Sequence, residues 1–138
     1  MSINFLQIQD ALGALLAADE SIKAIIGDNP DRIQAATEAN IDLPYITFGE
    51  DESKYIVSEC THLVDIFTPI NVWTSENGFR QNKQIASAII GLLHEQTIEI
   101  SPSLQVDFMF ERYRFDEDMA PGIKQGILEF RASVEQGI

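Results

Sequence analysis

The stretch that decides the fold runs from His62 to His94 and reads HLVDIFTPINVW (62–73), TSENG (74–78) and FRQNKQIASAIIGLLH (79–94). In the first segment apolar and other side chains alternate, and this period of two predicts a β-strand over Leu63–Trp73. The second segment has the composition of a turn. The third carries apolar side chains at helical spacing. We therefore expect a core in which an amphipathic helix packs on a sheet.

The two faces of this strand differ less than those of an ordinary half-exposed strand. One face is mostly apolar and carries Val64, Ile66, Ile70 and Val72. The other mixes apolar with polar side chains and carries Leu63, Asp65, Phe67, Asn71 and Trp73. A strand that is apolar on both faces is covered twice by its own chain or once by a neighbour.

We expect Leu63, Phe67 and Trp73 to contribute to an assembly interface, because they are the apolar side chains of the mixed face. Pro69 leaves this open. A proline cannot donate to a ladder, so it lies at a sheet edge, at a bulge or between two shorter strands. The last two arrangements could place Phe67 and Trp73 on different faces.

Two helices and a strand are expected before this stretch. Asn4 can cap a first helix, and Asp19 can cap a second helix that Gly27 ends. The segment 43–49 (LPYITFG) is typical of a strand closed by glycine. Residues 50–59 (EDESKYIVSE) are acidic and nearly devoid of apolar periodicity, which predicts a loop between two strands.

A loop of that length is more often functional or mobile than merely connecting. We therefore consider it a candidate docking segment, with a solvated connection as the alternative. Its candidate contact residues are Glu50, Asp51, Glu52, Lys54 and Tyr55.

The last third of the chain predicts a hairpin of strands 104–116 and 122–132. The expected order is then α-α-β-β-α-β-β, in one domain over residues 1–138. This is the α+β class, an antiparallel sheet with helices packed on one face.

The hairpin register follows from matching its apolar faces. Pairing Phe108 with Phe130 and Phe110 with Leu128 keeps both apolar sets together. Arg112 and Arg114 continue the parity of those phenylalanines. We interpret the two arginines as partners of nearby carboxylates, or alternatively as contacts to an acidic patch on a neighbouring subunit.

Charge excludes one class of function. The chain has 22 acidic and 9 basic residues, a formal net charge of −13. Backbone binding to a nucleic-acid duplex needs clustered Lys and Arg, so a duplex-binding role is not expected. The acidic surface either serves solubility or lets DNA pass without adsorbing. No apolar run is long enough for a membrane span, and the N-terminus has no signal-peptide pattern.

No catalytic, cofactor or metal site is expected. Phosphate-binding, dinucleotide-binding, zinc-protease and serine-hydrolase motifs are absent from the sequence. Cys60 and His62 share a strand face but lack the further ligands of a metal site or the orienting group of a nucleophile. The acidic triplets 50–52 and 116–118 lack calcium-loop spacing. A single cysteine fits a reducing compartment. We predict that the protein is not an enzyme.

The order of these pieces resembles a known family, the small tail-completion proteins of long-tailed phages, prophages and gene transfer agents, also called tail terminators or tail-to-head joining proteins. The matching segments cover nearly the whole chain. They are ALGALLAADESIKAIIGD (11–28), LPYITFG (43–49), NVWTSENG (71–78), QIASAIIGLLH (84–94), FERYRFDED (110–118) and GILEFRA (126–132). Pro69 departs from the unbroken alternation expected of the family's strand.

The resemblance implies a structural role in virion assembly. Such proteins form a ring, commonly of six subunits, that caps the tail tube, ends its polymerisation and meets the head. The implied partners are other copies of the chain, the tail tube protein and the head-closure protein, with DNA passing through unbound and no membrane. The implied location is the head-proximal end of the tail, reached by assembly in the host cytoplasm. The alternatives are a head-closure protein and a small acidic inhibitor or antitoxin.

Overall fold

The computed structural model describes residues 4–27, 32–34, 42–57, 62–75, 77–102, 104–116 and 122–136. Its helices are α1 (Phe5–Ala18), α2 (Glu20–Ile26) and α3 (Phe79–Leu93). Its strands are β1 (Ile33–Gln34), β2 (Tyr45–Phe48), β3 (Glu52–Val57), β4 (His62–Ser75), β5 (Gln96–Ser101), β6 (Leu104–Asp116) and β7 (Ile123–Gln136).

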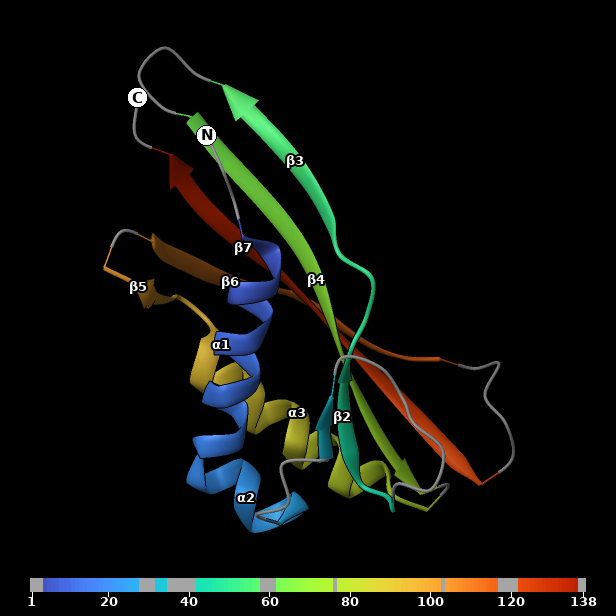
Figure 1. Ribbon diagram of the computed structural model, residues 1–138. Coiled ribbons are helices and arrows are strands. Elements are labelled where there is room, and N and C mark those ends of the chain that lie inside the picture. The colour runs from blue at the N-terminus through green and yellow to red at the C-terminus, as the bar shows by residue number, and fades with distance from the viewer. Residues whose placement is uncertain are drawn as a thin grey trace.

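The strands form one curled sheet with the helices on one side (Figure 1). Their order is β1-β2-β4-β7-β6-β5, and β3 also pairs with β4. All of these pairs are antiparallel except β1 with β2. The α+β class and the antiparallel sheet are therefore confirmed. The predicted order α-α-β-β-α-β-β is wrong in detail, because it lacks β1, β3 and β5.

The helices form where capping residues and apolar stripes coincide. The Asn4 side chain accepts a hydrogen bond from the Gln7 amide at 3.0 Å, and Asp19 accepts one from the Ile22 amide at 3.1 Å. Gly27 ends α2 with a φ of 87°, a conformation that glycine adopts without strain. The buried side chains of the three helices include Ile8, Leu12, Leu16, Ile22, Ile26, Ile85, Ile89 and Leu93.

The sheet completes the core with one face of each long strand. β4 and β7 pair without a register shift from His62 opposite Gln136 to Ser75 opposite Ile123. Alternate residues along these strands therefore point to the same side. The buried residues on the helix side include Val64, Ile66, Ile70, Val72, Phe108, Leu128, Phe130 and Val134.

β3 corrects the prediction of a loop over residues 50–59. Residues Glu52–Val57 form a strand that pairs antiparallel with β4. The strand escaped detection because almost all of its side chains are exposed, so it has no alternating apolar face. Charged side chains on such an edge also prevent further strand pairing. Only Glu50 and Asp51 of the candidate docking residues lie in the connection between β2 and β3.

Pro69 lies within β4 beside an interruption of its neighbouring strand. β2 ends with Phe48 opposite Ile70, and β3 begins with Glu52 opposite Phe67, so the edge bulges between them. The Gly49 amide donates to the Pro69 carbonyl at 2.9 Å. The N–H that proline lacks would point to this same side, where the ladder is already broken.

The predicted hairpin register is wrong, and β6 also carries a second bulge. Phe108 lies opposite Ala132 and Phe110 opposite Phe130, two residues away from the expected pairing. The register then shifts at Glu111, which places Arg112 opposite Glu129. The extra residue reverses the parity of β6. Tyr113 and Phe115 therefore join the helix side, whereas Arg112 and Arg114 point away from it.

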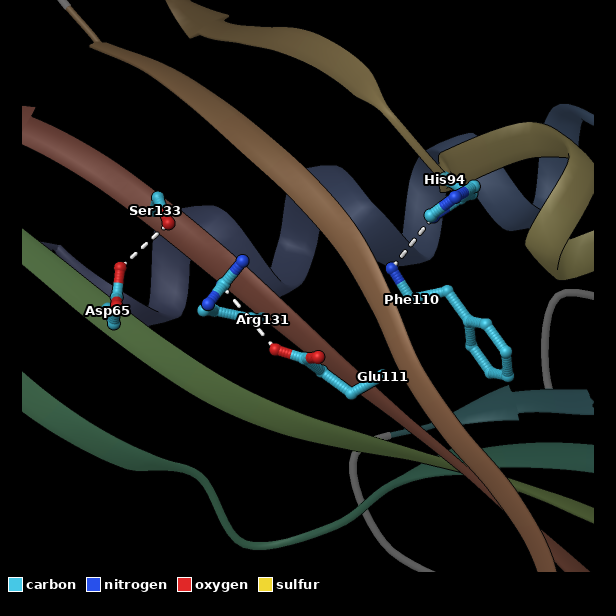
Figure 2. Close-up of polar contacts among 6 residues, drawn as sticks. All are labelled: Asp65, His94, Phe110, Glu111, Arg131 and Ser133. Atoms are coloured by element: carbon cyan, nitrogen blue, oxygen red, sulfur yellow. Dashed lines mark hydrogen bonds and ion pairs between the residues drawn. The ribbon is translucent and has the colours of Figure 1, made fainter.

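His94 supports the strand beside this bulge. Its Nδ1 atom accepts a hydrogen bond from the Phe110 amide at 3.0 Å (Figure 2). β5 begins at Gln96, which lies opposite Phe108, so its backbone does not extend to Phe110. The His94 side chain takes the place of the backbone there by accepting the Phe110 N–H. The same ring meets the Phe110 ring edge-on, with 6.3 Å between their centroids.

Candidate functional site

The candidate site is the sheet face turned away from the helices, which we call the open face. None of the described helices lies on it (Figure 1). It carries Leu63, Phe67, Pro69 and Trp73 of β4, Glu129 and Arg131 of β7, and Glu111, Arg112 and Arg114 of β6.

The unbroken β4–β7 register places Leu63, Phe67 and Trp73 on this one face. Pro69 therefore does not separate Phe67 from Trp73, because the bulge lies in the edge strand and not in β4. Phe67 is 40% exposed, and Leu63 and Trp73 are partly buried. Of the three, Phe67 offers the most apolar surface to another molecule.

Trp73 is held by contacts within its own chain. Its ring stacks on Tyr45 with 5.9 Å between centroids, and its Nε1 donates to Thr47 Oγ1 at 2.8 Å. Asn71 reaches the same hydroxyl at 3.4 Å and accepts a hydrogen bond from Gln125 at 3.2 Å. Trp73 thus belongs to a polar and aromatic cluster that joins β2, β4 and β7.

The arginines of β6 lie near one carboxylate of β7, that of Glu129. Arg112 Nε donates to Glu129 Oε2 at 2.6 Å. This hydrogen bond lowers the pKa of Glu129 below its usual range and raises that of Arg112. The positive charge of Arg114 lowers the pKa of Glu129 further. Arg114 itself is exposed.

A second ion pair crosses between the same strands. Arg131 of β7 lies 3.5 Å from Glu111, the bulge residue of β6 (Figure 2). The nearby Ser133 hydroxyl donates to Asp65 at 2.7 Å (Figure 2). This bond explains how Asp65 is buried on the open face. The middle of the face is therefore built from paired polar groups.

The two bulges meet at a hollow in the open face, which we call the acidic depression. Its volume is about 410 Å³. Pro69 and Glu129 face each other across β4 and β7 at its centre. The bulge after β2 lies beyond Pro69, and the Glu111 bulge lies beyond Glu129. The lining residues are Glu50, Glu52, Phe67, Thr68, Pro69, Glu111 and Glu129.

A buried polar cluster holds α3 against the sheet. Asn82 is fully buried, and its amide donates to the Val72 carbonyl at 2.9 Å and to Thr74 Oγ1 at 3.1 Å. Its oxygen accepts from the Tyr113 hydroxyl at 2.7 Å. Burial raises the pKa of Tyr113 to about 12. Our sequence analysis missed this cluster, although an asparagine one turn before Ile85 in an apolar stripe is a signal for it.

The sequence places the protein in a family. The family described as tail completion protein gp17 matches residues 10–135. The chain belongs to this family. Its members are structural phage tail proteins, so the role of this tail completion protein is a structural one in tail assembly. None of the curated proteins matches it significantly.

The fold of this tail completion protein also occurs in a solved virion. A chain of the virion of a native gene transfer agent particle superimposes with a TM-score of 0.78 at 23% sequence identity. The match covers 94% of this chain and 95% of the other. At this identity the likeness concerns the fold.

The candidate residues of the tail completion protein do not all share one surface. Glu50 and Glu52 line the acidic depression. Lys54 follows the parity of Glu52 in β3, whereas Tyr55 points to the helix side and is 47% exposed. Asp51 borders α1 through a small hollow that it shares with Phe5.

Other sequence candidates are only partly visible. Cys60, Glu117 and Asp118 lie outside the described residues. Among the described residues, no three His, Cys, Asp or Glu side chains are arranged to hold a metal ion. Nor is any described helix long and apolar enough to span a membrane. Glu111 and Glu129 were not predicted as site residues, because their meeting with Glu50 and Glu52 depends on both bulges.

Proposed function

We propose that this tail completion protein forms a ring, commonly of six subunits, at the head-proximal end of the tail tube. There it ends tube polymerisation and provides the joint to the head. Its partners are other copies of the chain, the tail tube protein and the head-closure protein. Family membership and the virion in which the same fold occurs support this role.

The observation that carries the proposal is the open face. The helices bury one side of the sheet, while the other presents Phe67 beside a hollow of about 410 Å³. An exposed aromatic beside a concave, partly apolar surface is the composition found at protein interfaces.

The acidic charge is consistent with a ring through which DNA passes. A net charge of −13 opposes adsorption of a phosphate backbone. In the proposed cycle the subunits are made in the host cytoplasm and meet the tube there. DNA later crosses the ring without being bound.

The decisive experiment is electron microscopy of particles from a strain in which the gene is deleted. We expect overlong, headless tails, because nothing would stop polymerisation of the tube. Supplying the intact gene in trans should restore tails of normal length joined to heads. Tails of normal length beside leaking heads would instead identify a head-closure protein. An acidic inhibitor or antitoxin would leave particle morphology unchanged.

A further inference from the structure

We propose that neighbouring subunits contact each other through the acidic depression of one copy and a basic patch at the start of α3 of the next. The basic patch consists of Phe79, Arg80, Lys83 and Lys124. The inference rests on the proposed ring and names the surfaces that close it.

The acidic depression carries negative charge that the described residues do not neutralise. Glu111 and Glu129 are compensated by Arg131 and Arg112. Glu50 and Glu52 are exposed, and no described residue forms an ion pair with either of them. Two uncompensated carboxylates therefore flank the exposed ring of Phe67, which lies directly opposite Glu52 in the β3–β4 ladder.

The basic patch has the complementary composition. Phe79 is 46% exposed and packs edge-on against Phe115. Lys124 Nζ lies over the Phe79 ring, 4.5 Å from its centroid. Arg80 and Lys83 are exposed and three residues apart on α3, so they share one side of the helix. Among the described residues, no carboxylate forms an ion pair with these three bases.

The pairing follows from the charge of the whole chain. Two copies with a net charge of −13 repel each other, so a contact between them needs locally opposite charges. Arg80, Lys83 and Lys124 are three of the nine basic residues; the first two lie on α3 with Phe79, and Lys124 lies over the Phe79 ring. Each surface combines an exposed aromatic ring with uncompensated charge, and the signs are opposite.

The position of the two surfaces sets the symmetry. The acidic depression lies in the middle of the open face, whereas α3 lies against the other face of the sheet (Figure 1). A contact between different surfaces of identical chains is heterologous, and it closes into a ring when the rotation between copies divides a full turn. This is the geometry that a tail cap requires.

Reciprocal charge reversal tests the contact. Purified variants are added to heads and to tails from the deletion strain, and the particles in which a tail is joined to a head are counted by electron microscopy. Glu50→Lys with Glu52→Lys, and separately Arg80→Glu with Lys83→Glu, should each lower the number of joined particles at least about tenfold. A chain carrying all four substitutions should regain most of the lost joining, because its charges are exchanged but still complementary.

A matched control separates local from overall charge. Asp10→Lys with Glu99→Lys changes the net charge by as much as the reversal in the acidic depression, at exposed positions elsewhere. This control should join tails as the wild type does. Circular dichroism melting of every variant should stay within a few degrees of the wild type, since all substituted side chains are exposed.

Several outcomes would overturn the inference. Normal joining of tails by either doubly substituted variant would contradict the proposed contact. So would a variant with all four substitutions that joins tails no better than the two doubly substituted variants. If only the acidic reversals impair joining, the depression binds a different protein. Failure of the proposed function is recognised separately, because tails from the deletion strain would then join heads without any added protein.

Discussion

At the scale of single residues, Gly126 shows how closely α3 approaches the sheet. A Cβ atom there would overlap Asn82 Oδ1 and lie 2.9 Å from Tyr113 Cε1. The missing side chain thus makes room for the amide that joins α3, β4 and β6. Buried polar groups are costly unless every one of them is bonded. In the described residues this requirement is met, since no buried side-chain N or O atom lacks a partner.

Gly126→Ala should lower the free energy of unfolding by about 1–3 kcal/mol, because the added methyl displaces Asn82 from its hydrogen bonds. Urea unfolding measures the change. Gly91→Ala is the matched control, because Gly91 is exposed in α3 and a Cβ there meets nothing within 4 Å. It should stabilise the protein by up to about 1 kcal/mol. Equal effects of the two substitutions would contradict the role given to Gly126.

The Arg112–Glu129 pair makes stability depend on pH. The pKa of Glu129 is lower in the folded chain than its usual value of 4.5. Its contribution to stability is therefore complete above the unfolded pKa and is lost as the pH falls through the folded pKa. Melting temperatures between about pH 3 and 6 should fall less steeply for Arg112→Gln than for the wild type. Parallel curves for the two proteins would show that the pair does not contribute.

At the scale of elements, β3 is a strand of low stability. Among the described strands it pairs with β4 alone, and its side chains bury little surface. Hydrogen exchange should find its ladder amides protected relative to an unfolded chain but exchanging well before those of β4 and β7. Amides of β3 that exchange at the unfolded rate would restore the prediction of a loop.

The elements that were predicted correctly are those with a regular apolar period. α3 and β4 are amphipathic and packed on the core, so their patterns are visible in the sequence. β3 was missed because exposure removes the pattern. The hairpin register was wrong by two residues because a slip of two keeps the same apolar faces together, so matching those faces does not distinguish the two pairings. The Glu111 bulge leaves no local signal in composition and shifts the pairs nearer the turn by one residue more.

The same limit applies to the candidate site. The alternation of β4 correctly places Phe67 and Trp73 on one face. The acidic depression could not be predicted, because it brings together Glu50, Glu111 and Glu129 from three segments far apart in the sequence. Their proximity depends on two bulges whose alignment only the folded sheet defines.

At the scale of the whole molecule, a substitution at Phe67 distinguishes a role in assembly from a role in folding. Phe67→Ser should leave the melting temperature nearly unchanged and reduce the joining of tails, because the side chain is largely outside the core. Phe5→Ser, at a similarly exposed phenylalanine of α1, is the control and should join tails normally. Unfolding of Phe67→Ser would place this side chain in the core and refute its role in assembly.

Trp73 should behave differently from Phe67. Trp73→Ser removes the stacking on Tyr45 and the hydrogen bond to Thr47, so we expect it to lower the free energy of unfolding by about 2–3 kcal/mol. Chemical denaturation measures this change. A fully stable Trp73→Ser variant with impaired joining would instead assign Trp73 to the interface.

The two aligned bulges also have a mechanical consequence. They divide the sheet into one half that includes β3 and β5 and another that includes β1 and β2, and β4, β6 and β7 run through both halves. A tensile load between molecules bound to the two halves would pass along the covalent backbone of these three strands. Separating the halves would mean shearing many ladder hydrogen bonds at once instead of opening them one after another.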